Sequence, residues 1–102
     1  MNKKKEIREN FRNSVFERDE YKCRVCSKTG DLDAHHITDR NEMPNGGYVI
    51  QNGISLCDEC HEKAEVWHNS NKENFIEGYH PDDLYKKINS SYQLAYKKSL
   101  EI

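Results

Sequence analysis

Apolar side chains recur at helical spacing near both ends of the chain. Ile7, Phe11 and Val15 are four residues apart, so they share one stripe of a helix that we expect over residues 6–19. A second stripe follows a proline and two acidic residues and predicts a closing helix over about residues 81–98. Its apolar members are Leu84, Ile88, Tyr92 and Ala95. Each helix therefore has one face to bury against the middle of the chain.

The middle of the chain contains two short strand patterns separated by a polar loop. Residues 32–37 and 54–56 are predicted strands, and the Gly- and Asn-rich stretch 38–53 is long for so small a domain. A further helix is expected from an N-cap at Asp58 to about residue 67 or 68. The pattern predicts one small α+β domain over residues 1–102, with a helix on each flank.

Composition limits how much core these elements can form. Hydrophobic residues make up 34% of the 102 residues and charged residues 33%, and a domain this small usually needs disulfides or a bound metal. Charge is uneven, because residues 1–30 hold nine Lys/Arg and five Asp/Glu, whereas the remainder holds seven and thirteen. A basic first third suits contact with nucleic acid, although small soluble proteins often show such an imbalance by chance.

The sequence also indicates where the protein acts. No apolar run approaches the roughly 20 residues that cross a membrane, and the basic N-terminal residues are not followed by the apolar core of a secretory signal. We therefore expect a cytoplasmic protein with no membrane partner. Thiols stay reduced in that compartment, which favours metal binding by the cysteines over disulfide formation.

The four cysteines form two Cys-x-x-Cys pairs, Cys23 with Cys26 and Cys57 with Cys60. Two such knuckles can present four thiolates tetrahedrally to one Zn²⁺ ion. Two disulfides are the alternative, but a bridge within a Cys-x-x-Cys is strained. A structural zinc would supply folding free energy and would tie the start of the domain to the start of the central helix.

Several short motifs together resemble the HNH endonuclease family, whose fold is the ββα-metal finger. They are RDEYKCRVC at 18–26, DAHHI at 33–37, NGISLC at 52–57 and CDECH at 57–61. The first of these is similar to the zinc-bearing branch of the family. Each motif is weak alone, whereas the set is specific. The resemblance covers about residues 11–68 as the core of the domain.

The resemblance implies a role for each polar residue of these motifs. His36 corresponds to the general base that deprotonates the attacking water, a task for which imidazole has a suitable pKa. His35 and His61 correspond to ligands of one catalytic metal. Asn52 corresponds to a residue that holds the loop so that the base is oriented, or in some members binds the metal.

One position departs from the family. Many members have a second histidine four residues after the one that matches His61, and this chain has Glu65 there. Glutamate one helical turn away still reaches the same point, and it favours Mg²⁺ or Mn²⁺ over Ni²⁺ or Zn²⁺. A solvated helix residue is the equal alternative for Glu65, with His68 as a reserve ligand.

The expected function is therefore metal-dependent hydrolysis of DNA phosphodiester bonds, by nicking or double-strand cleavage. A zinc-stabilised nucleic-acid-binding module without catalysis is the alternative. Small free-standing members of the family are often encoded by phages or prophages, so other DNA-processing proteins are candidate partners. Basic residues expected to contact the DNA backbone without reading bases are Arg12, Arg18, Lys22, Arg24 and Arg40.

Overall fold

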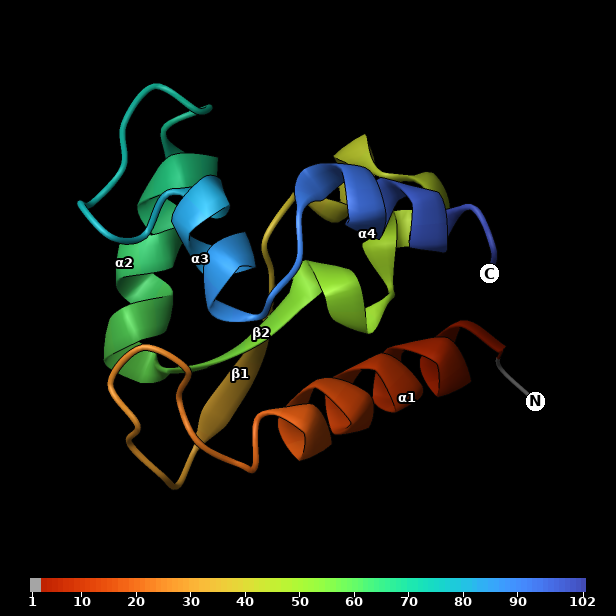
Figure 1. Ribbon diagram of the computed structural model, residues 1–102, viewed down its shortest axis with the longest axis horizontal. Coiled ribbons are helices and arrows are strands. Elements are labelled where there is room, and N and C mark those ends of the chain that lie inside the picture. Colours follow the sequence, from red (N-terminus) through yellow and green to blue (C-terminus); the bar gives the residue numbers. More distant parts are fainter. Residues whose placement is uncertain (1–2) are drawn as a thin grey trace.

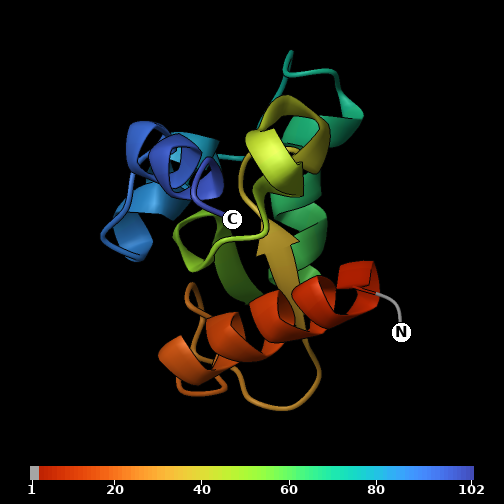
Figure 2. The same ribbon diagram turned by 90° about the vertical axis from the view of Figure 1, so that its right-hand side faces the viewer.

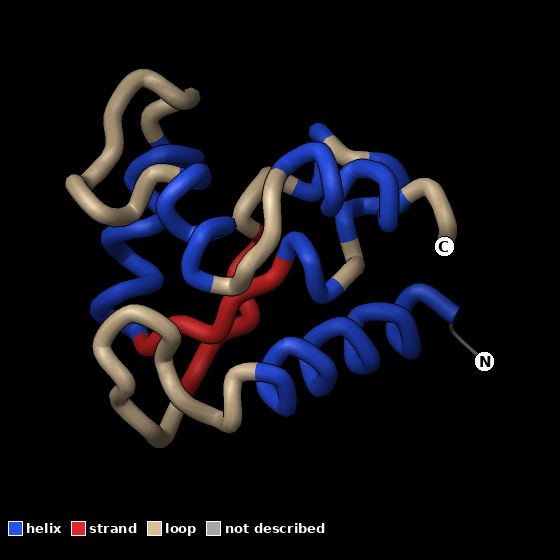
Figure 3. Tube along the Cα trace, viewed as in Figure 1, coloured by secondary structure: helices blue, strands red, loops and turns tan. Residues whose placement is uncertain are grey.

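A computed structural model describes residues 3–102 of the protein, which are mostly helical around one short sheet (Figures 1 and 3). The helices and strands are α1 (Lys3–Arg18), β1 (Leu32–His36), β2 (Gly53–Cys57), α2 (Asp58–Asn69), α3 (Pro81–Lys87) and α4 (Tyr92–Ser99). This arrangement confirms the predicted α+β class, with the two strands and the central helix in the expected order. Within the described range, no helix is both long and apolar enough to span a membrane.

The sheet is a single antiparallel pair in which Leu32 lies opposite Cys57 and His36 opposite Gly53. Glycine at position 53 lets α1 approach β2 closely. A Cβ there would lie 2.5 Å from Cγ2 of Val15 and 2.7 Å from Cζ of Phe11, both on the apolar stripe of α1. The predicted stripe is therefore the face by which α1 packs on the sheet.

The central helix α2 packs on the sheet at a different side from α1, and Figure 2 shows β1 between the two helices. Ala64 of α2 and Leu84 of α3 are each 1% exposed and belong to the same buried cluster as Ile54 and Leu56 of β2. The helix begins one residue earlier than an Asp58 cap would require, since Cys57 is its N-cap. Asp58 instead lies in the first turn, where a carboxylate is stabilised by the helix dipole.

The prediction of one closing helix over residues 81–98 is wrong, because the segment folds as α3 and α4 with a break between them. Asn89 adopts φ 53°, a left-handed conformation that ends a helix and that asparagine tolerates. The hydroxyl of Ser91 then accepts a hydrogen bond from the amide of Leu94 at 3.1 Å and caps α4. Both halves still bury parts of the predicted stripe, including Leu84 and Ala95.

The long loop between the strands contains three short 3-10 turns, Arg40–Glu42, Pro44–Gly47 and Ile50–Asn52. Gly47 has φ +63°, and a Cβ at this position would lie 2.6 Å from the side-chain nitrogen of Asn52. Glycine is therefore required both by the backbone conformation and by the close approach of the Asn52 amide. The loop is thus folded around one buried side chain.

Candidate metal centres and catalytic site

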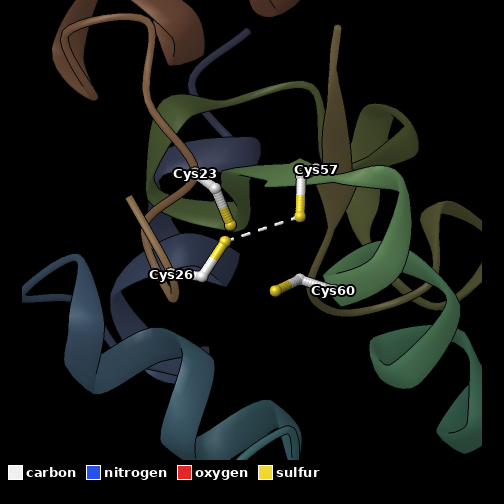
Figure 4. Close-up of side chains that lie close together, drawn as sticks. All are labelled: Cys23, Cys26, Cys57 and Cys60. Carbon is white, nitrogen blue, oxygen red and sulfur yellow. Dashed lines mark hydrogen bonds between the residues drawn. The ribbon is translucent and has the colours of Figure 1, made fainter. Parts of the chain in front are cut away.

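The four cysteine thiols converge on one point beside the sheet (Figure 4). Cys23 and Cys26 come from the segment after α1, whereas Cys57 ends β2 and Cys60 lies in the first turn of α2. One sulfur atom from each residue lies within 4.8 Å of all the others, and the Cys26 and Cys57 sulfurs are 3.6 Å apart. All four are free thiols, so they form the four-donor set that suits a structural Zn²⁺ ion rather than two disulfides.

The surroundings give the thiols unequal acidities. Burial opposes ionisation of Cys23, but hydrogen bonds from backbone groups, chiefly at Cys26 and Cys57, outweigh it and lower its pKa to about 7. Burial raises the pKa of Cys60 to about 12, although the hydroxyl of Tyr79 donates a hydrogen bond to its sulfur at 3.3 Å. Four thiolates so close together require a cation, which is the condition that bound zinc would satisfy.

A second cluster of donor atoms lies between β1 and α2. His35 is 3% exposed, and its Nδ1 atom lies 3.2 Å from Oε1 of Glu65. Nε2 of His61 lies 3.1 Å from the same carboxylate oxygen, since His61 and Glu65 are one turn apart on α2. These three residues each offer one donor atom, all within 4.8 Å of one another. The expected ligands therefore meet at one place, Glu65 included.

The protonation states of this cluster suit a divalent cation. The hydrogen bond with His35 is the main reason why the pKa of Glu65 falls to about 2, so its carboxylate is ionised at neutral pH. Burial lowers the pKa of His35, which keeps this imidazole neutral. Two imidazoles and one carboxylate leave open positions for water and phosphate on a metal that binds nitrogen and oxygen.

Asp33 is a member of this region that sequence reasoning missed. Its Oδ2 atom lies 3.2 Å from Nδ1 of His61, on the opposite side of the ring from Glu65. A carboxylate in that position fixes the tautomer and orientation of a ligating histidine. Its place in the sequence carries a signal, because residues two apart on a strand face the same way and Asp33 is two residues before His35.

Comparison with protein-family models finds a match over residues 23–66 to the family described as HNH endonuclease. The matched segment holds all four cysteines and all three members of the histidine–glutamate cluster. Residues 23–66, called the HNH domain below, match this family. Comparisons with curated proteins and with solved structures find no match. The family is one of nucleases, which assigns the chain a nuclease or related nucleic-acid function at the level of the family.

The side chain of His36, in the HNH domain, lies on the opposite face of β1 from the side chain of His35. Its ring stacks on Phe11 with centroids 4.6 Å apart and meets the edge of Tyr48 at 5.0 Å. Burial, with smaller contributions from the charges of His35 and Arg40, lowers the pKa of His36 to about 4. Its Nε2 atom is buried and has no hydrogen-bond partner among the residues that the structure describes.

The two neighbouring histidines nevertheless line one hollow of about 350 Å³. This hollow, called the catalytic hollow below, is lined by Ala34, His35, His36, Asp39, Arg40, Asn41, His61, Glu65 and His68. His68 lies beside the ligand cluster, with its Nε2 atom 3.2 Å from the carbonyl oxygen of His36, but it is not one of the three clustered donors. The hollow thus joins the candidate metal ligands and the candidate base.

Asn52 of the HNH domain is completely buried and does not face the ligand cluster. Its carbonyl oxygen accepts hydrogen bonds from the Thr38 amide at 2.8 Å and the Tyr85 hydroxyl at 2.7 Å. Its amide nitrogen donates to the carbonyls of Thr38 at 3.0 Å and Gly47 at 3.3 Å. These contacts hold both ends of the loop that follows His36, and Tyr85 is a partner that sequence reasoning missed.

The basic residues expected to contact DNA occupy two different environments. Arg40 lines the catalytic hollow, and Arg12 is exposed on α1 with its guanidinium 5.2 Å from the ring centre of Phe16. Lys22 is exposed in the turn after α1.

Arg18 and Arg24 instead form part of the framework. Arg18 donates to the carbonyls of Ile50 at 2.6 Å and Gly53 at 2.7 Å and pairs with the buried Asp19. Arg24 donates to the carbonyl of Lys87. Their guanidinium groups link separate parts of the chain.

Proposed function

We propose that this HNH domain hydrolyses phosphodiester bonds of DNA with one divalent metal and a histidine base. The observation that carries the proposal is the catalytic hollow, where three candidate metal ligands and a neutral histidine lie together. The family match supports a nuclease, and the geometry gives each polar group a chemical task.

His35, His61 and Glu65 would hold the metal, since their donor atoms already converge and their charge states suit a cation. When bound, such an ion polarises a phosphate oxygen and offsets the charge that develops on the leaving 3′ oxygen. Asp33 would keep the His61 ring turned toward the cluster. A carboxylate beside two imidazoles favours Mg²⁺ or Mn²⁺, with Ni²⁺ or Zn²⁺ as alternatives.

His36 would take the proton from the water that attacks phosphorus. Its pKa is lowered to about 4, so the imidazole is neutral at physiological pH and has a lone pair that can accept a proton, but it is a weaker base than an ordinary histidine. Nε2 is buried, which leaves Nδ1 as the nitrogen to face a water in the hollow. Attack on phosphorus then breaks the bond to the 3′ oxygen and leaves a 5′ phosphate on the product.

The four cysteines would bind a structural Zn²⁺ ion that takes no part in the chemistry. The cluster joins the segment after α1 to the β2–α2 junction, and α2 carries two of the three candidate ligands of the catalytic metal. Zinc binding would therefore fix the direction in which α2 presents His61 and Glu65.

Cleavage of supercoiled plasmid tests the proposal. Zinc-loaded protein is incubated with plasmid and added Mg²⁺, Mn²⁺, Ni²⁺ or Zn²⁺, and the products are separated by electrophoresis. We expect nicked or linear DNA with at least one of these metals and none when the added metal is chelated. Binding of DNA without cleavage under every metal would instead identify a zinc-stabilised binding module.

A further inference from the structure

Two further hollows are lined by residues of α1, and the first of them shares a lining residue with the catalytic hollow. Arg40 also lines a hollow of about 520 Å³ together with Tyr48 and Arg8. Arg8 in turn lines a third hollow, of about 310 Å³, that includes Lys5 and Arg12. The shared arginines therefore mark a path that begins beside the candidate base and continues along the first helix.

Cationic side chains repeat along this path at the spacing of one helical turn. Lys4, Arg8 and Arg12 are four residues apart, and all three are exposed. At about 1.5 Å per residue, the stripe from Lys4 to Arg12 is roughly 12 Å long. Each strand of B-DNA carries one phosphate per about 3.4 Å of helix axis, so this length matches three or four phosphates.

Arg40 connects the stripe to the site of chemistry. Its Nη1 atom donates to the hydroxyl of Tyr48 at 3.2 Å, and the ring of Tyr48 packs against both His36 and Phe11. The same Phe11 is part of α1 and stacks on His36. The helix, the arginine and the base are thus held in one packed unit, which fixes their relative positions.

We infer that the exposed face of α1 is a phosphate track, and that Arg40, Arg8 and Arg12 hold the backbone of the DNA strand as it leaves the catalytic hollow. This inference rests on the proposed function. Arg18 and Arg24 do not belong to the track, because their guanidinium groups bond to main-chain carbonyls of segments far away in the sequence. Within the described part of the chain, Arg8 donates only from Nε to the carbonyl of Lys4, within its own helix. Contacts to phosphate position a duplex without reading its sequence, so the track confers little base preference.

Binding of a fluorescently labelled 20-base-pair duplex, measured by anisotropy at several salt concentrations without added divalent metal, tests the track. Each phosphate contact contributes about 0.9 to the slope of log affinity against log salt. The double variant Arg8→Gln/Arg12→Gln should therefore reduce the slope by about 2, and Arg40→Gln by about 1. Melting temperature and zinc content establish that each variant is folded. If the double variant does not fold, the slope of Arg40→Gln alone tests the track.

The matched control is Lys86→Gln/Lys87→Gln, which removes two exposed charges from α3, across the sheet from α1 (Figure 1). Its slope should equal that of wild type. Unchanged slopes in the track variants, or an equal loss in the control, would overturn the inference. If the wild-type protein cleaves plasmid while the track variants bind DNA with the wild-type salt slope, the inferred track is refuted and the proposed nuclease activity stands. If the slopes fall as expected but no metal supports cleavage, the proposed nuclease activity fails and the track stands.

Discussion

The ring of Phe11 lies flat against the imidazole of His36, with centroids 4.6 Å apart and planes inclined by 11°. Phe11 belongs to α1, outside the segment that matches the family, yet it forms one wall of the position that the candidate base occupies. Glycine at position 53, opposite His36 in the sheet, is what allows α1 to come this close. The flanking helix is therefore part of the site.

Phe11→Leu should slow cleavage while leaving metal binding intact. Leucine keeps an apolar side chain at the site but removes the flat surface against the imidazole, so His36 gains rotational freedom. Misplacement of a catalytic group by about 1 Å costs on the order of 10²-fold, so we expect a loss of roughly 10- to 100-fold in rate. Val15→Ala is the control, because it loosens the same buried face of α1 without touching His36. Equal cleavage rates in the two variants would contradict a positioning role for Phe11.

Glu65→Gln should weaken binding of the catalytic metal far more than it affects folding. The substitution removes the negative charge of the Glu65 carboxylate. Its Oε1 atom lies 3.2 Å from Nδ1 of His35 and 3.1 Å from Nε2 of His61. Loss of groups that merely orient metal ligands costs about 10- to 100-fold in affinity, and loss of a ligand should cost at least the upper value. Calorimetric titration with Mn²⁺ measures it, with Glu62→Gln on the exposed side of α2 as the control. If Glu65→Gln binds Mn²⁺ with wild-type affinity, Glu65 is a surface residue and not a metal ligand.

Cys60→Ser should release zinc and lower the melting temperature sharply. Serine is a poor zinc ligand, and the lost site would free the β2–α2 junction from the segment after α1. Tyr79→Phe is the milder companion, since it removes a single hydrogen bond to the Cys60 sulfur and should retain zinc. Zinc content by a chromogenic chelator and melting by circular dichroism check both variants. Full zinc occupancy with unchanged melting in Cys60→Ser would refute the four-cysteine assignment.

The imidazole of His36 should titrate well below the ordinary range for histidine. Burial lowers its pKa to about 4 from a usual value near 6.5, so the ring stays neutral as the pH falls from 7 to 5. Chemical shifts of the ring protons in zinc-loaded protein without added catalytic metal report this directly, and His36→Ala assigns the signal. A midpoint at or above pH 6.5 would contradict the buried, neutral base.

Motif spacing and the resemblance to the HNH family together predicted which residues meet at the two clusters. The cysteine pairs and the relation of His61 to Glu65 follow from local geometry, because knuckle turns and one helical turn fix those distances. The fold class follows equally from the stripe on α1 and the two strand patterns. In these cases the sequence signal lies within one element or at its end.

Other features depend on contacts between residues far apart in the chain. The stacking of Phe11 on His36 and the bond from Tyr85 to Asn52 arise only when distant elements pack. The break between α3 and α4 depends on the left-handed conformation of Asn89, which competes with an unbroken apolar stripe. For Arg18, a basic side chain in the sequence gives no sign that main-chain carbonyls will accept its hydrogen bonds.

The rate at which His36→Ala nicks plasmid at saturating metal tests whether His36 is the general base. General-base removal typically costs about 10²–10⁴-fold, so we expect a loss of that size, with metal affinity unchanged and a smaller defect at higher pH, where hydroxide replaces the base. His35→Ala should instead bind metal weakly and regain part of its activity as the metal concentration rises. Cleavage by His36→Ala at the wild-type rate would contradict the assignment of the base. If His36→Ala loses the metal while His35→Ala retains it, His36 is the metal ligand and His35 is the base.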